Sequence, residues 1–131
     1  KEKMVFIDKE TNDLSYKIIG CAYNVHKELG PGLLESAYKT CLCYELSKIE
    51  INYEKQKGLP IIYKDVTLDC GYRIDILVEN KIVIELKTVE KLLPIHTAQI
   101  MTYLKLSNKH LGLLFNFYNA NLQNGIKRYV L

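Results

Sequence analysis

The 131-residue chain has no tryptophan, only three prolines and no apolar run approaching the roughly 20 residues of a membrane span. It shows no signal-peptide pattern, no internal repeat, no low-complexity tract and no linker. These absences argue against a membrane protein, a secreted protein and a repeat protein. We therefore expect a cytoplasmic protein with one domain that spans residues 1–131.

Cysteine spacing and net charge exclude further classes. The cysteines show neither a CxxC pair nor paired metal-ligand spacing. We interpret all four as reduced core residues rather than disulfide partners or metal ligands: Cys21, Cys41, Cys43 and Cys70. The formal charge of +3 is small, so it permits a polyanionic partner without requiring one. Hydrophobic residues make up 48% of the chain, which is enough to bury a core.

Hydrophobic periodicity predicts a mixed fold. Helical spacing indicates a first helix that is capped by Asp13 or Ser15 and stops at Gly30, with residues 1–12 irregular. A second helix is expected from Gly32 to about Lys48. Consecutive antiparallel strands follow at 51–57, 59–63, 66–68 and within 72–88. A helix at 94–106 and strands at 111–117 and 126–130 complete an α/β fold of the mixed α+β kind.

The strongest chemical signal lies in residues 72–88, with the sequence YRIDILVENKIVIELKT. Because side chains alternate along a strand, Asp75 is expected on the face opposite to Ile74 and Ile76. On the second strand, Glu85 and Lys87 share one face. Pairing the apolar rows of both strands places Asp75 across from Glu85, with residues 79–81 as the loop.

This register brings two like charges together. Carboxylates about 5 Å apart repel by roughly 3 kcal/mol at an effective dielectric near 20, so a cation should sit beside Asp75 and Glu85. Both are hard oxygen ligands suited to Mg²⁺. Attack of water on a phosphodiester needs a metal that binds the water and offsets the charge growing on the phosphate. Lys87 points the same way, and three roles stay open: orienting water, deprotonating it or neutralising the transition state. The alternative is a solvent-facing charged strand, but Leu77 and Val83 on the same face favour a partly covered cleft.

Asp75 followed by Glu85-Leu86-Lys87 resembles the signature of the PD-(D/E)XK nuclease superfamily, although no proline precedes the aspartate. Upstream, residues 32–38, GLLESAY, fit the GxxExxY pattern of one small bacterial and archaeal family within that superfamily. Downstream, residues 99–103, QIMTY, resemble the QxxxY motif of lambda-exonuclease-like and recombination nucleases. The resemblance covers about residues 14–130 and implies a restriction-endonuclease-like core, in which a central mixed β-sheet is flanked by helices.

The same resemblance implies roles for individual residues. Four metal ligands are implied, the last acting directly or through water: Asp75, Glu85, the backbone carbonyl of Leu86, and Glu35. Lys87 is the implied catalytic lysine. On its own, Glu35 equally suits a solvated glutamate favoured by the helix dipole. Gln99 and Tyr103 lie four residues apart on one helical face, so both could reach a phosphate or the neighbourhood of the lysine. The alternative is that they serve only in packing.

These expectations lead to one principal hypothesis and two alternatives. The principal hypothesis is a Mg²⁺-dependent nuclease, with Mn²⁺ as a substitute metal and DNA favoured over RNA as the substrate. The second is a nucleic-acid-binding or partner-binding module that keeps the site without catalysis. The third is a structural hairpin in a protein whose tyrosine-rich helices form a homodimer interface.

Overall fold

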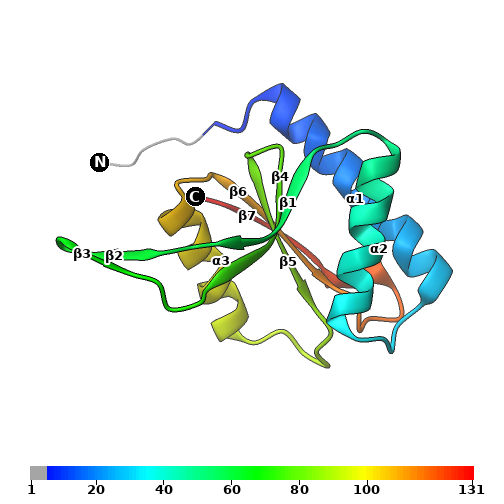
Figure 1. Cartoon of the computed structure of the whole chain (residues 1–131). Helices are drawn as coiled ribbons and strands as arrows, with labels where there is room; N and C mark the ends of the chain where they lie inside the picture. The colour runs from blue at the N-terminus through cyan, green and yellow to red at the C-terminus, as the bar shows by residue number, and fades with distance from the viewer. Residues whose placement is uncertain (1–5) are drawn as a thin grey trace.

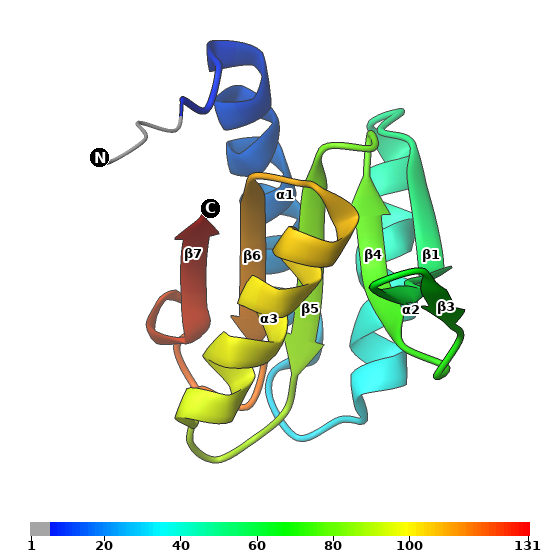
Figure 2. The ribbon, with the colours of Figure 1, turned by 90° about the vertical axis from the view of Figure 1, so that its left-hand side faces the viewer.

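A computed structural model describes residues 6–131, and its centre is a five-stranded mixed sheet in the order β1-β4-β5-β6-β7 (Figure 1). Helices α1 and α2 cover one face of the sheet and α3 covers the other (Figure 2). The sheet strands are β1 (Tyr53–Gly58), β4 (Arg73–Val78), β5 (Ile82–Lys87), β6 (Leu111–Asn116) and β7 (Ile126–Val130). The helices are α1 (Lys9–Leu29), α2 (Glu35–Lys48), α3 (Pro94–Ser107) and the short 3₁₀ turn η1 (Leu122–Gly125). The mixed α/β fold class is confirmed.

Helix α1 begins earlier than its sequence pattern suggested. The side chain of Asp8 accepts a hydrogen bond from the Thr11 N–H and caps the helix at Lys9. The predicted cap at Asp13 or Ser15 is therefore wrong, and residues 9–12 are helical rather than irregular. Asp13 instead accepts from Lys9 one helical turn earlier. Residues 1–5 of the predicted irregular segment lie outside the described residues.

Two hydrophobic clusters hold the three layers together. The larger lies between the sheet and helices α1 and α2, and the strands contribute side chains such as Ile76, Ile84 and Leu86 to it. The smaller lies under α3, where Leu77 and Val83 meet the helix side chains. From Ile76 onward, alternate residues of β4 and β5 therefore face opposite layers, as expected for strands covered on both sides.

The strand neighbours differ from a simple meander. β1 pairs with β4, while β2 (Ile61–Tyr63) and β3 (Val66–Leu68) form a separate two-stranded ribbon. The expectation of consecutive antiparallel strands is wrong here because the chain leaves the sheet after β1 and returns at β4. Leu59 closes the base of this excursion by donating its N–H to the Tyr72 carbonyl, and Pro60 follows without an N–H to extend the ladder. The ribbon projects from the body on the face that α3 covers (Figures 1 and 2).

The strand order brings one end of the sheet together as a site. β5 and β6 are parallel and α3 connects them, so their carboxyl ends lie at the same edge. β4 runs antiparallel to β5, so its first residues lie at that edge too, as does the start of α2 (Figure 2). In open sheets of this kind, ligands bind at such carboxyl ends.

The burial of the cysteines and the apolar length of the helices were both predicted from composition. The cysteines are all free, but only Cys21 and Cys43 are buried; Cys41 is half-buried and Cys70 is exposed. The prediction that all four are core residues is therefore wrong for Cys70, which lies in the polar segment between the ribbon and β4. Among residues 6–131, no helix is both long and apolar enough to cross a bilayer.

Candidate active site

The β4–β5 hairpin has the predicted register. Ile76 lies opposite Ile84, and Val78 lies opposite Ile82. Residues 79–81 form the loop, in which Glu79 and Asn80 have positive φ angles of 51° and 55°. Such angles suit the tight reversal of a short hairpin connection.

The hairpin ladder changes at the two acids. The Asp75 N–H donates to Glu85 Oε2 at 3.0 Å, and the Leu86 N–H donates to Asp75 Oδ2 at 2.8 Å. Each carboxylate thus accepts from the backbone of the opposite strand, which locks the two acids side by side. Strict alternation also breaks at this point, because Ile74 packs under α3 while Ile76 packs on the other face. The predicted shared face of Ile74 and Ile76 is therefore wrong.

A lysine from α2 supplies a positive charge beside the acids. Lys39 Nζ lies 3.4 Å from Asp75 Oδ1, and the two side chains are only 14% and 17% exposed. The repulsion between Asp75 and Glu85 predicted a cation here, but the sequence pattern did not point to Lys39. The available signal was its position four residues after Glu35, which puts both on one face of the helix.

Burial strongly perturbs Glu85, whose side chain is 3% exposed. Desolvation raises the pKa of Glu85 to about 8, and the negative charge of Asp75 adds to the rise. The hydrogen bond from the Asp75 N–H and the charges of Lys87 and Lys39 oppose it. A carboxyl group with such a pKa is mostly protonated at neutral pH unless another cation compensates its charge.

The third member of the hairpin motif is connected to α3. Lys87 Nζ donates to Gln99 Oε1 at 2.9 Å, and Gln99 Nε2 donates to Tyr103 Oη at 3.2 Å. Burial raises the pKa of Tyr103, and the charge of Glu85 contributes to the rise. The structure thus joins Gln99 and Tyr103 to the lysine through hydrogen bonds, one of the two arrangements that the sequence left open.

The GxxExxY segment builds the loop that leads to Glu35. Gly32 has a φ of 104°, which favours glycine, and Glu35 opens α2. The buried Tyr38 hydroxyl donates to the Gly30 carbonyl and accepts from the Leu33 N–H, and its ring stacks on Phe117 at 4.4 Å. The motif tyrosine therefore fixes the loop, while Glu35 stands half-buried at the edge that carries Asp75.

A buried asparagine fixes the segment after Lys87. The Asn116 side chain donates to the Val89 carbonyl and accepts from the N–H groups of Val89 and Tyr118. These bonds tie the end of β5 to the end of β6 and so restrict the backbone beside the lysine. Nothing in the local sequence pattern indicated this residue.

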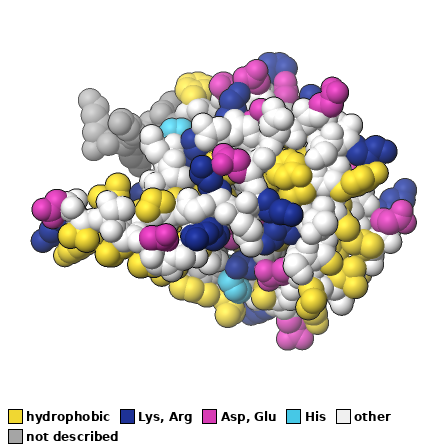
Figure 3. Space-filling view, in the orientation of Figure 1, with side chains coloured by type: hydrophobic (Ala, Val, Ile, Leu, Met, Phe, Trp, Pro, Cys, Tyr) yellow, Lys and Arg dark blue, Asp and Glu magenta, His cyan; other side chains and the backbone are white. Residues whose placement is uncertain are grey.

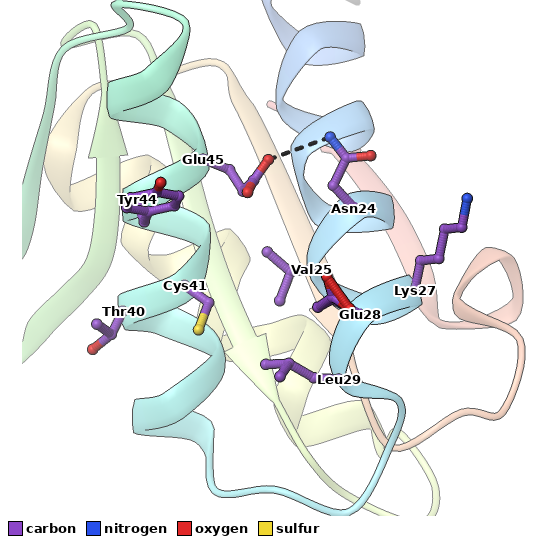
Figure 4. Close-up of a pocket in the computed structure, with 9 residues that line it drawn as sticks. All are labelled: Asn24, Val25, Lys27, Glu28, Leu29, Thr40, Cys41, Tyr44 and Glu45. Carbon is purple, nitrogen blue, oxygen red and sulfur yellow. Dashed lines mark hydrogen bonds between the residues drawn. The ribbon is translucent and has the colours of Figure 1, made fainter.

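A groove of about 810 Å³ lies elsewhere, between α1 and α2 (Figure 4). Val25, Leu29 and Cys41 point into it, and none of the predicted site residues lines it. The nearby Tyr44 is exposed, whereas Tyr38 is buried. Tyr38 is thus unavailable for the homodimer interface expected on these helices, and that interface stays a prediction.

Comparison with known proteins agrees with this geometry. The family model described as the PD-(D/E)XK nuclease superfamily matches residues 12–129. The chain belongs to the PD-(D/E)XK nuclease superfamily. No curated protein and no solved structure matches the chain.

Membership in the PD-(D/E)XK superfamily agrees with the restriction-endonuclease-like arrangement of sheet and helices. The narrower GxxExxY assignment stays a prediction, as do the roles of the individual site residues.

PD-(D/E)XK nucleases generally use divalent metals, and the donor set of this chain fits one. Asp75 and Glu85 are hard oxygen donors held side by side, and Glu85 is buried with too little positive charge to keep its ordinary pKa. Within residues 6–131, no three acidic, histidine or cysteine side chains gather as a ready metal cluster. Glu35 therefore does not complete a three-carboxylate group with Asp75 and Glu85.

Proposed function

We propose that this PD-(D/E)XK protein is a metal-dependent nuclease that hydrolyses phosphodiester bonds, with DNA as the preferred substrate. One observation carries the proposal: Asp75 and Glu85 are locked side by side at the sheet edge, next to a lysine held by Gln99. Membership in a nuclease superfamily supports a nucleic-acid substrate. The preference for DNA rests on the motif resemblance, so the assay includes RNA.

Asp75 and Glu85 are the proposed metal ligands, together with the Leu86 carbonyl. Bound Mg²⁺ or Mn²⁺ would supply Lewis-acid polarisation of a phosphate oxygen and a lower pKa for an attacking water. The protein contributes preorganisation, because backbone N–H groups hold both carboxylates before any metal arrives. Glu35, on the neighbouring helix start, is proposed to act on the metal through water rather than as a direct ligand.

Lys87 is the proposed catalytic lysine. Its ammonium donates to the Gln99 amide oxygen, a neutral acceptor, so its full positive charge remains to meet a phosphate. Gln99 in turn is held by Tyr103. These two residues of α3 position the lysine, and their own contact with the phosphate is not needed for that role.

The test is a cleavage assay on plasmid, linear duplex, single-stranded DNA and RNA with Mg²⁺, Mn²⁺ or EDTA. Asp75→Ala, Glu85→Ala and Lys87→Ala are each expected to reduce cleavage at least about 100-fold. Matched controls are Lys9→Ala and Asp13→Ala, which remove an exposed ion pair at the start of α1, at the opposite end of the sheet from the site (Figure 2). Cleavage that survives in all three site variants, or that persists in EDTA, refutes the proposal.

A second candidate function is a binding module without turnover. The specific observation in its favour is the Lys39–Asp75 contact, through which the protein partly compensates its own site charge. This candidate predicts salt-dependent binding of nucleic acid by the wild type and no cleavage with either metal. The cleavage assay and a parallel binding assay separate the two functions.

A further inference from the structure

A second groove, of about 230 Å³, lies next to the proposed active site. One wall is formed by α3, with Ile95, Gln99, Tyr103 and Leu106. The other wall is formed by Ile61 of β2 and by Tyr72, which directly precedes β4. The β2–β3 ribbon and α3 lie on the same face of the sheet, so the groove opens between them (Figure 2).

The rim of this groove is apolar and exposed. Ile95 is 66% exposed and Tyr72 is 45% exposed, although both are large hydrophobic side chains. Apolar side chains also lie along the projecting ribbon, as the space-filling view shows (Figure 3). Within residues 6–131, nothing covers this surface. Exposed apolar side chains that cluster beside a polar site indicate a binding surface.

The groove is continuous with the proposed catalytic residues. Gln99 and Tyr103 line it, and the same two side chains form the hydrogen-bond chain that ends at Lys87. A ligand with a negative group at Lys87 and a flat apolar group beside it would therefore fill both places at once. Arg73, next to Tyr72, adds a second cation near the groove, partly compensated by Asp69 at 3.8 Å.

We propose that this groove binds an unpaired nucleobase of the substrate, stacked against the Tyr72 ring, while the adjoining phosphate lies at Lys87. A nucleotide joins a flat ring with an apolar face to a phosphate, which matches the order of groups along the groove. A base inside a duplex stays stacked and paired, so only a single strand, a loop or a frayed end can place its base there. The inference rests on the proposed nucleic-acid substrate and names its class as unpaired strands.

The test measures binding in EDTA by fluorescence anisotropy, so that cleavage does not interfere. The probes are a labelled single-stranded DNA and the blunt duplex of the same sequence. Tyr72→Ala is expected to weaken single-strand binding by about 5-fold to 150-fold, the equivalent of 1–3 kcal/mol per stacked base, and to change duplex binding less than about twofold. Tyr72→Phe keeps the ring face and is expected to bind as the wild type does.

Tyr63→Ala is the matched control, since Tyr63 is an exposed tyrosine of the ribbon that does not line the groove. Thermal unfolding confirms that each variant is folded. The inference is overturned if the wild type does not bind the single strand, if Tyr72→Ala behaves like Tyr63→Ala, or if it weakens both probes equally. Tyr72-dependent binding of single strands without cleavage by the wild type would instead overturn the nuclease and leave this inference standing.

Discussion

Glu85→Gln tests whether a buried, uncompensated carboxyl group sits at the centre of the site. In the folded protein the pKa of Glu85 lies at about 8, above the ordinary value of 4.5. The folded state therefore binds a proton more tightly than the unfolded state. The resulting stability is fully present below pH 4.5 and is lost as the pH rises toward 8. Glutamine keeps an oxygen to accept the Asp75 N–H but removes the titration.

The expected size follows from the pKa shift. A rise of this extent corresponds to about 3–5 kcal/mol of stability lost by the metal-free wild type between pH 4.5 and 8. For a chain of 131 residues, one kcal/mol moves the midpoint of thermal unfolding by about 3–4 °C. The midpoint of Glu85→Gln relative to the wild type should therefore rise by roughly 10–20 °C across this pH range.

The assay is thermal unfolding of both proteins in EDTA, followed by circular dichroism at several pH values. Only the difference between the two proteins is used, because it cancels the titration of all other groups. With Mg²⁺ present, the wild type should regain stability chiefly at high pH, where Glu85 would otherwise be a bare buried charge. Parallel curves for the two proteins, with or without metal, would refute the reasoning.

Three further outcomes follow from particular contacts. Lys39→Met should lower the Kd for Mg²⁺ several-fold in calorimetric titration, because it removes the ammonium group that lies 3.4 Å from Asp75 in the wild type. An unchanged or higher Kd contradicts this prediction. Tyr38→Phe should cost about 1–3 kcal/mol in urea unfolding, because it removes the two hydrogen bonds of the hydroxyl to the Gly30 carbonyl and the Leu33 N–H. An effect below about 0.5 kcal/mol argues against this. Gly20→Ala should stabilise the protein by about 0.5–1 kcal/mol, because Gly20 lies in a helix with open space around it. Gly125→Ala should destabilise the protein by about 1–3 kcal/mol, because the added Cβ collides with the Asn116 carbonyl. Urea midpoints that rank the two variants in the opposite order reject both predictions.

Local signals were enough to predict most of the fold. Helix α3 begins at Pro94, as predicted, and runs to Ser107, one residue beyond the predicted end. Asn108 caps it in the left-handed conformation, with a φ of 57°. The start of α1 was missed because two aspartates compete, and the cap is decided by backbone geometry rather than by residue type. The pairing of β1 with β4 was also missed, since adjacency along the chain carries no information about a ribbon that leaves the sheet.

The site was predictable where spacing determines geometry. The register of β4 and β5 follows from the apolar rows, and it brings Asp75 to Glu85. Lys39 was missed because its contact depends on how α2 lies across the sheet, which no local pattern specifies. The groove at Tyr72 was missed for the same reason, because its walls come from segments that meet only in the folded chain.

In the metal-free protein, a proton on Glu85 and the ammonium group of Lys39 reduce the repulsion between the two acids. With a pKa of about 8, Glu85 is mostly protonated at neutral pH, while Asp75 lies beside Lys39. A metal that binds both carboxylates must release that proton and compete with that ammonium. Its apparent affinity should therefore increase as the pH rises toward 8 and level off above it, because uptake of the ion and loss of the proton are linked at Glu85. The strand-to-strand hydrogen bonds already hold the two acids side by side without a metal, so we expect this exchange to need little rearrangement of the fold.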